Sequence, residues 1–353
     1  LDLLSYYVEP LIFISFFLKS LFLIILLTII RKEKVFLFII ICFFLIIHLI
    51  YSSMSLELLP SNVLKFVSFI ISPFIITKYK TDNYSYNNFI LILFIIIVLN
   101  TVLGVLGIGK INYGEIDGSS VGVRGLFFSG NELSILFCGI VSLITLSNYR
   151  YKIFLIFLLL ISSLFIATKS TILFTTIIFI YMLIKKINFI QKVALFSTLP
   201  LFLLYVFRDR FSILLTRWEF FFNKSGNFLE FITSARVNRI TTTSNLFNDM
   251  SIFELLFGLG SENLKDRLFQ ISGFFGSFEI DPLDIFFSYG FLGISLYAST
   301  WYKCFSLANT KISKLIIFLF LFLSIIAGHF SESSYSSFII ILILFFSINS
   351  PRK

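Results

Sequence analysis

The sequence predicts an all-α, polytopic membrane helix bundle with about eleven transmembrane helices, because its composition suits a lipid environment. Of the 353 residues, 58% are hydrophobic and only 13% are charged, and the mean hydropathy is +0.98. An ordinary soluble globule does not have this composition. Apolar runs of about 20 residues, the length that a helix needs to cross a hydrocarbon core, recur along nearly the whole chain. We therefore expect a single integral membrane domain over residues 1–353.

The apolar runs define the expected helices in order. They cover 10–30, 35–51, 62–77, 88–108, 131–147, 152–167, 170–184, 192–207, 283–302, 314–328 and 333–348. The sequence begins at Leu1 without methionine, which leaves room for one further helix before it. The segment 208–282 is too long for a simple connector. Its mixture of Arg, Trp and Phe predicts an extracytoplasmic loop that carries short interfacial helices.

Positive charges set the predicted orientation, since cytoplasmic loops hold the excess of Lys and Arg. Alternate connections carry 15 of the 28 basic residues, in the stretches 31–34, 78–80, 150–152, 185–192, 303–314 and 352–353. We place these stretches inside, which puts the remaining connections outside. The outer connections are 52–61, 109–130, 168–169, 208–282 and 329–332. The net charge of +9 follows from this topology, so no nucleic-acid partner is expected.

Basic residues on the predicted outer face are candidates for binding an anion. Arg124 precedes the start of an expected helix, where guanidinium, backbone N–H groups and helix dipole all favour a negative charge. The same helix begins with Ser129 and Glu132, which fit a capping box. Arg236 and Arg239, three apart on one helical face, could grip a diphosphate or contact lipid headgroups.

Candidates for acid–base chemistry also lie on the predicted outer face. In "DPLD", Asp281 fits an N-cap before Pro282, so a structural use competes with catalysis at this residue. Glu279 has no such capping role, which makes it the better candidate for a general base. His329 lies in a short turn between two expected helices, where it is either a satisfied interfacial histidine or an acid–base group.

One apparent nucleotide motif is rejected. Residues 104–110, "GVLGIGK", have the spacing of a phosphate-binding loop, but Ile111 follows where Ser or Thr is needed and no strand is expected before it. Dinucleotide, zinc-protease and nucleophile-elbow motifs do not occur in the sequence. We therefore expect no cofactor and no metal.

Taken in chain order, the polar motifs resemble the O-antigen polymerase and O-antigen ligase superfamily of bacterial envelope enzymes. The motifs are Arg124-Gly125 with Asn131, then "TKST", "SAR", "FGLG", "EIDPLDIFFSYGFLG" and "AGHFSES", within about residues 100–340. Members of this superfamily are multi-spanning glycosyltransferases that use undecaprenyl diphosphate-linked sugars. The ligase branch has a histidine eleven residues before the glycine that matches Gly290, and Glu279 stands there in this chain. This departure favours the polymerase-type members.

The resemblance implies a metal-independent polymerase. It would join undecaprenyl diphosphate-linked oligosaccharide repeat units on the outer face of the bacterial cytoplasmic membrane, making O-antigen or capsule-type polysaccharide. The implied catalytic residues are Glu279, which would take the acceptor hydroxyl proton, Asp284 or His329 as alternative base or orienter, and Arg236 at the leaving diphosphate. The implied substrate-binding residues are Arg124, Asn131, Lys169, Arg239 and Asp281.

Two other functions compete with polymerisation. A ligase would move finished glycan to a lipid or protein acceptor, whereas a transporter would carry the same lipid-linked sugars across the membrane. A transporter is expected to line a cavity with charges through the membrane depth and often has inverted repeats, and the sequence indicates neither. The expected partners are the lipid-linked oligosaccharide, membrane lipids and a chain-length regulator protein.

Overall fold

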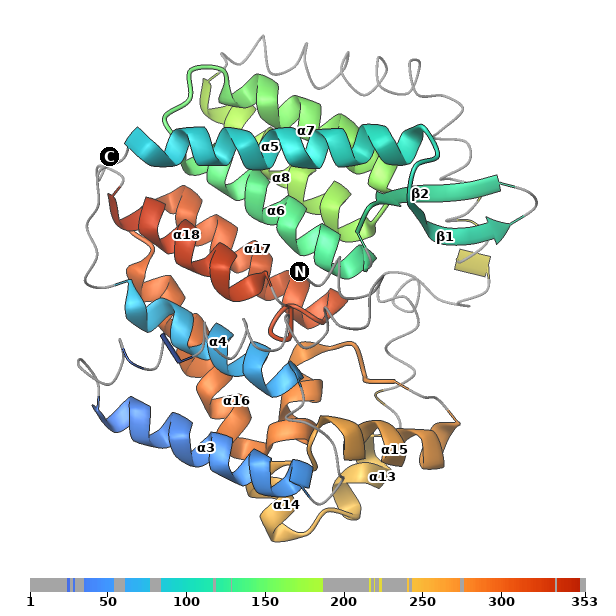
Figure 1. Cartoon of the computed structure of the whole chain (residues 1–353), viewed down its shortest axis with the longest axis vertical. Helices are drawn as coiled ribbons and strands as arrows, with labels where there is room; N and C mark the ends of the chain where they lie inside the picture. The colour runs from blue at the N-terminus through green and yellow to red at the C-terminus, as the bar shows by residue number, and fades with distance from the viewer. Residues whose placement is uncertain are drawn as a thin grey trace. The chain divides into compact units, whose positions relative to one another are not determined.

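The chain forms two compact units, and each is mostly helical. The computed structural model describes residues 35–53, 61–76, 84–116, 119–127, 129–186, 243–273, 276–333 and 335–349, with short additions at 24–25, 28, 216, 219, 222–223 and 240. Unit 1 comprises Leu1–Thr81 with Ile232–Lys353, and unit 2 comprises Asp82–Phe231. The described residues form twelve helices and one two-stranded sheet (Figure 1). The single membrane domain over 1–353 stays a prediction beside this division.

The described part of unit 2 is a group of four helices with a β-hairpin at one end (Figure 1). The helices are α5 (Tyr84–Val105), α6 (Gly130–Leu146), α7 (Lys152–Ile166) and α8 (Lys169–Lys186). Neighbouring helices run antiparallel along the chain and pack on one another. The expected helices at 88–108, 131–147, 152–167 and 170–184 are confirmed as helices, whereas the one expected at 192–207 lies outside the described residues.

The hairpin corrects the all-α prediction. Strands β1 (Lys110–Ile116) and β2 (Ser119–Gly125) pair antiparallel, with Lys110 opposite Gly125 and Ile111 opposite Val123. The segment between α5 and α6 satisfies its backbone groups by this pairing, because a connection outside a helix must find hydrogen bonds elsewhere. The sequence holds a hairpin signal, Asp-Gly at 117–118 between two short strand-like runs.

Unit 1 is built around the long helix α16 (Asp281–Leu307), which packs against α4 (Ser61–Ile75), α17 (Lys311–Ala327) and α18 (Ser336–Asn349). Helix α3 (Val35–Ser53) lies on the other side of α4 from α18 (Figure 1). The helices expected at 35–51, 62–77, 283–302, 314–328 and 333–348 are confirmed as helices within shifted bounds. The helix expected at 10–30 lies outside the described residues apart from 24–25 and 28.

The segment before α16 carries the short helices α13 (Thr243–Asn248), α14 (Ile252–Phe257) and α15 (Ser261–Ser272). Short helices in this part of 208–282 were predicted and are confirmed. They share a small hydrophobic core with the start of α16, made by Leu246, Met250, Leu259, Leu264, Leu268, Phe278 and Phe287. These apolar contacts attach the segment to the first turns of α16.

Helix α16 is interrupted at Gly290, where the backbone leaves the helical region (φ 67°, ψ −164°). The loop 258–260 fills the break: the Leu259 N–H donates to Phe287 O at 2.8 Å, and the Gly260 N–H donates to Ser288 O at 2.9 Å. The helix predicted over 283–302 is therefore present but kinked at this point. The backbone groups freed by the break are partly satisfied by the loop, as buried polar groups require.

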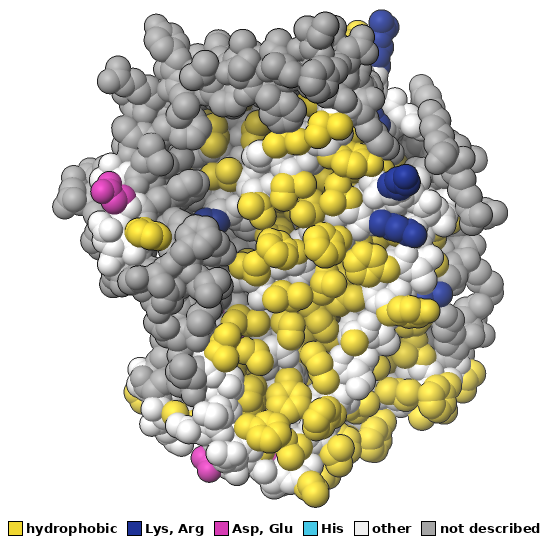
Figure 2. All heavy atoms as spheres, turned by 180° about the vertical axis from the view of Figure 1, so that it is seen from behind, with side chains coloured by type: hydrophobic (Ala, Val, Ile, Leu, Met, Phe, Trp, Pro, Cys, Tyr) yellow, Lys and Arg dark blue, Asp and Glu magenta, His cyan; other side chains and the backbone are white. Residues whose placement is uncertain are grey.

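The membrane prediction is met in part. Among the described residues, one stretch, Asn87–Val105 of α5, is both long and apolar enough to cross a bilayer, a test that core helices of soluble proteins also pass. Six shorter apolar helices lie at Val35–His48, Asn62–Ile75, Gly130–Leu146, Lys152–Ile166, Lys169–Ile184 and Ser336–Ile348. Only 28% of this stretch of α5 is buried within the protein. Hydrophobic side chains also cover much of the molecular face shown in Figure 2.

Candidate active site

Arg124 holds the two strands of the hairpin together. Its Nε donates to the carbonyl oxygen of Ile111 at 2.8 Å, and its Nη2 donates to that of Asn112 at 3.2 Å. Arginine has five N–H donors, so this use occupies part of the guanidinium. The sequence suggested an anion-binding role alone for Arg124, and the structure adds an internal one.

Asn100 of α5 fastens the hairpin to the helix. Its Nδ2 donates to the carbonyl oxygen of Arg124 at 2.9 Å, and its Oδ1 accepts the Leu126 N–H at 2.9 Å. Gly125 lies between these two residues with φ +60°, and a Cβ there would sit 2.5 Å from Asn100 Oδ1. Glycine is therefore required at 125 both by its backbone angle and by the close approach of α5.

Replacing Asn100 with Ala is expected to loosen the hairpin. Asn100 is 5% exposed, so its loss leaves the Leu126 N–H and the Arg124 carbonyl without these partners in a poorly hydrated place. Such losses cost about 1–3 kcal/mol. The variant should have a lower apparent melting temperature in detergent and faster proteolysis within 110–125. An unchanged melting temperature and cleavage rate would contradict this role.

The hairpin meets the turn between α7 and α8 at the same end of unit 2. Asn112 Nδ2 donates to the Ile166 carbonyl oxygen at 2.6 Å. Nearby, the hydroxyl groups of Ser134 in α6 and Thr168 in the turn are 2.9 Å apart. The predicted outer connections 109–130 and 168–169 therefore lie together, as a common sidedness requires.

Three predicted substrate-binding residues are brought to this end of unit 2: Arg124, Asn131 and Lys169. Asn131 is exposed at the start of α6, and Lys169 is half-exposed at the start of α8. Ser129 is the N-cap residue of α6, but its side chain makes no capping hydrogen bond, so the predicted capping box is wrong. The first N–H groups of α6 are thus not capped by this side chain.

In unit 1, Asp281 is a buried acceptor and not the N-cap that the sequence predicted. Helix α16 begins at Asp281 with Ile280 as N-cap residue. The Asp281 Oδ2 accepts the Ser324 hydroxyl of α17 and, at 2.8 Å, the Ser331 N–H. Asp281 is 2% exposed. It joins the start of α16 to the end of α17 and the turn that follows.

Asp284 takes the capping function instead. Its Oδ1 accepts the Phe278 N–H at 2.7 Å, and its Oδ2 accepts the Ile280 N–H at 3.2 Å. Both carboxylate oxygens therefore serve the backbone before α16, and the side chain is buried. This use explains Asp284 without catalysis.

Glu279 and His329, the other two predicted acid–base residues, lie in loops that touch. Both have positive φ, +57° and +62°, a region that non-glycine residues occupy at a strain of roughly 1–3 kcal/mol, typically at functional sites. Gly328 packs so closely on Glu279 that a Cβ would be 2.3 Å from its carbonyl oxygen. His329 interacts electrostatically with Asp281. The structure thus gathers Glu279, Asp281, Asp284 and His329 at one end of unit 1.

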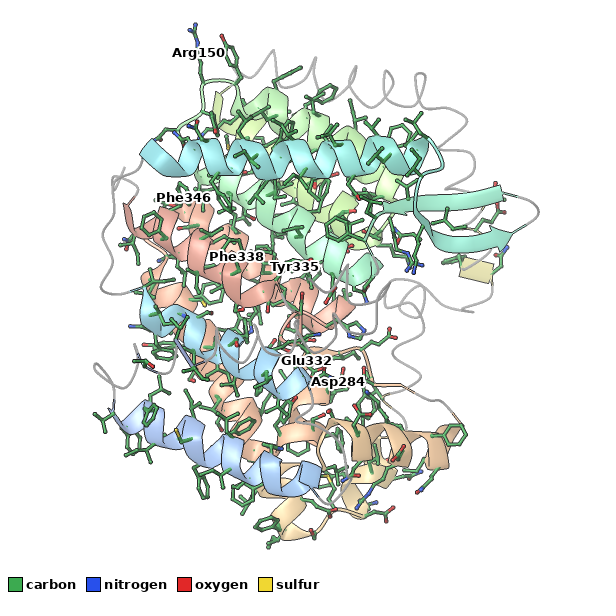
Figure 3. The ribbon with its side chains drawn as sticks, in the orientation of Figure 1. Arg150, Asp284, Glu332, Tyr335, Phe338 and Phe346 are labelled. Atoms are coloured by element: carbon green, nitrogen blue, oxygen red, sulfur yellow. The ribbon has the colours of Figure 1, made fainter. Side chains whose placement is uncertain are left out.

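A residue that sequence reasoning missed completes this group. Glu332 lies in the turn after α17, and its Oε1 accepts the Tyr289 hydroxyl at 3.1 Å. Its charge also reaches Asp284, and the two carboxylates are neighbours in Figure 3. The signal was present in "AGHFSES", where an acid lies three residues after the histidine between two apolar helices.

The surroundings of Glu332 shift its ionisation. Burial raises the pKa of Glu332 to about 7, and the negative charge of Asp281 adds to the rise. Opposing contributions come from the Tyr289 hydroxyl, Lys65 of α4 and Lys265 of α15. A carboxylate with a pKa near neutrality is suited to proton transfer.

Comparison of the chain with protein-family models, curated proteins and solved structures finds no match in any of the three. The resemblance described above therefore rests on the motifs. Of the predicted site residues, Arg236 and Arg239 lie outside the described part of the chain. The remaining predicted site residues fall into one group in each unit.

Proposed function

We propose that this chain is an integral membrane glycosyltransferase that polymerises undecaprenyl diphosphate-linked oligosaccharide repeat units on the outer face of a bacterial cytoplasmic membrane. The proposal includes a helix bundle that crosses the membrane many times. In support, isoleucine and leucine side chains project from α5 along its length, at Leu91, Ile92, Ile95, Ile96 and Leu99. A lipid-facing helix has such a surface.

The observation that carries the proposal is the contact between the motifs of the resemblance within unit 1. "FGLG" pairs with the break in "EIDPLDIFFSYGFLG" through the hydrogen bonds to Phe287 and Ser288. "AGHFSES" meets the start of the same motif through Ser331 and Asp281. Three short sequences that are weak signals separately are thus joined at one end of one helix, which is the arrangement expected of a shared site.

The chemistry has two requirements, and the chain offers candidate residues for each. The two phosphates of the donor need cationic partners, and the candidates are Arg124 and Lys169 of unit 2, with Arg236 and Arg239 as sequence candidates. Asn131 and the N-terminus of α6 would add neutral donors. The acceptor hydroxyl needs a base, and the carboxylates and histidine of unit 1 are of the right type.

The test is surface glycan length in a strain that lacks the gene, complemented with wild type, Arg124→Ala or Asn100→Ala. Wild type should restore a ladder of long chains on a gel, and Arg124→Ala should leave mainly single repeats. The arginine's hydrogen bonds with phosphate are worth about 1.5–3 kcal/mol, or roughly ten- to a hundredfold in rate. Membrane levels of each protein are measured together with the glycan.

Asn100→Ala is the matched control, because it disturbs the same hairpin without removing a positive charge. At equal membrane levels it should retain the ladder that Arg124→Ala loses. Equal loss in both variants would assign Arg124 to hairpin structure alone. Long but unattached chains in the deletion strain would identify a ligase, and repeat units held on the cytoplasmic face would identify a transporter.

A further inference from the structure

Tyr289 and Glu332 form a pair that the predicted site did not include. Tyr289 is fully buried in α16, with its ring stacked on Phe66 at 4.6 Å and edge-on to Phe44 and His48. This packing fixes the ring, so the hydroxyl that meets Glu332 at 3.1 Å is held in place. A buried tyrosine whose hydroxyl is directed at a carboxylate by three aromatic side chains is a rigid support for that carboxylate.

Glu332 differs from the two aspartates in how much of its hydrogen-bonding capacity remains for a ligand. Asp281 and Asp284 are nearly fully buried, and their hydrogen bonds serve the fold. Glu332 is half-buried. Among the described residues, its carboxylate accepts one hydrogen bond, which the Tyr289 hydroxyl donates. One carboxylate oxygen of Glu332 is therefore left for a ligand.

From this geometry we infer that Glu332 is the general base that removes the proton from the acceptor hydroxyl, and that Tyr289 is its positioning residue. The inference rests on the proposed glycosyl transfer. In that step the acceptor oxygen forms a bond to the anomeric carbon, and the bond from that carbon to the diphosphate oxygen breaks. The electron pair of the broken bond leaves with the diphosphate, and the hydroxyl proton moves to the Glu332 carboxylate.

The charges around Glu332 make the step dependent on pH. Among the described residues, the titratable groups that interact with Glu332 are Asp281, Asp284 and Tyr289 of α16, Lys65 of α4 and Lys265 of α15, and His329 of its own turn interacts with Asp281. The base must be ionised to accept a proton, so the rate should rise as pH passes through about 7 and then level off. The Tyr289 hydroxyl favours the ionised form, so removing it should move this rise to higher pH.

The test uses the purified full chain in detergent, with the lipid-linked repeat units that accumulate in the deletion strain, and measures the initial rate of chain growth between about pH 5 and pH 9. Glu332→Gln should lower the rate about 10²–10⁴-fold. Tyr289→Phe, which keeps the ring packing, should shift the rising limb upward in pH. Asp266→Asn, an exposed carboxylate on α15, is the matched control and should behave as wild type.

Each outcome separates this inference from the proposed function. If wild type does not lengthen the repeat units, glycosyl polymerisation itself fails. If wild type lengthens them and Glu332→Gln does so at a similar rate, or if Glu279→Gln alone abolishes growth, the assignment of Glu332 is overturned while the polymerase remains. If Glu332→Gln does not fold, the Tyr289→Phe profile decides, because an unshifted limb contradicts the pair.

Discussion

Gly258→Ala should strongly destabilise unit 1. Gly258 has φ 84° and ψ 177°, a backbone region that is nearly exclusive to glycine. A Cβ there would lie 2.2–2.3 Å from backbone atoms of Ser288 and Tyr289 in the break of α16. Strained φ and overpacking each cost roughly 1–3 kcal/mol, so we expect a loss of about 2–6 kcal/mol. The measurement is the apparent melting temperature in detergent, with the amount of protein in membranes.

Gly260→Ala is the matched control for this prediction. Gly260 is two residues away in the same loop and has nearly the same backbone angles, φ 83° and ψ 150°, but nothing lies within 4 Å of its added Cβ. It should therefore show the cost of the backbone angle alone, roughly 1–3 kcal/mol. Equal destabilisation by the two variants would show that the close approach to α16 is not what requires glycine at 258.

The same contact shows why the order of the helices could be predicted but the joints between them could not. Apolar runs are local features, so the helices from α3 to α8 and from α16 to α18 follow from the sequence within a few residues. The break at Gly290 depends on a loop about thirty residues earlier in the chain, whose N–H groups bond to Phe287 and Ser288. A glycine in an apolar run gives no indication of that distant partner, since isolated glycines are tolerated in helices.

The hairpin of unit 2 was missed for a different reason. Its signal, Asp-Gly at 117–118, is local and present in the sequence. The prediction treated everything between two membrane runs as a loop, whereas a connection of this length gains hydrogen bonds by pairing with itself. Arg124 was then interpreted only by its charge, although two carbonyl groups of the opposite strand also accept its hydrogen bonds.

Sequence reasoning located the acidic site but exchanged the roles of its members. "DPLD" offers two aspartates to the backbone before α16, and local rules favour Asp281 as the cap. Tertiary contacts decide otherwise, because Ser324 and Ser331 reach Asp281 from the end of α17 and leave the backbone to Asp284. Glu332 was missed because its partner Tyr289 is 43 residues away along the chain.

Asp281→Ala should therefore destabilise the protein rather than only inactivate it. The Ser324 hydroxyl has one hydrogen, and it donates this hydrogen to Asp281 in a hydrogen bond. In the contact between Tyr297 and Ser324, where the two hydroxyl oxygens are 2.9 Å apart, the Tyr297 hydroxyl is therefore the donor. The result is a chain of hydrogen bonds that ends on Asp281. Removing the carboxylate leaves the Ser324 hydroxyl and the Ser331 N–H without an acceptor in a buried place, which costs about 1–3 kcal/mol for each group.

Ser324→Ala separates the structural role of Asp281 from a catalytic one. It removes one partner of the carboxylate and leaves the Ser331 N–H bonded, so it should lower the melting temperature less than Asp281→Ala does. The double variant should lose less than the sum of the two single losses, since the Asp281–Ser324 bond is counted in both. If Asp281→Ala kept the wild-type melting temperature and still abolished chain growth, the aspartate would act in catalysis, and the hydrogen bonds to Ser324 and Ser331 would serve to position it.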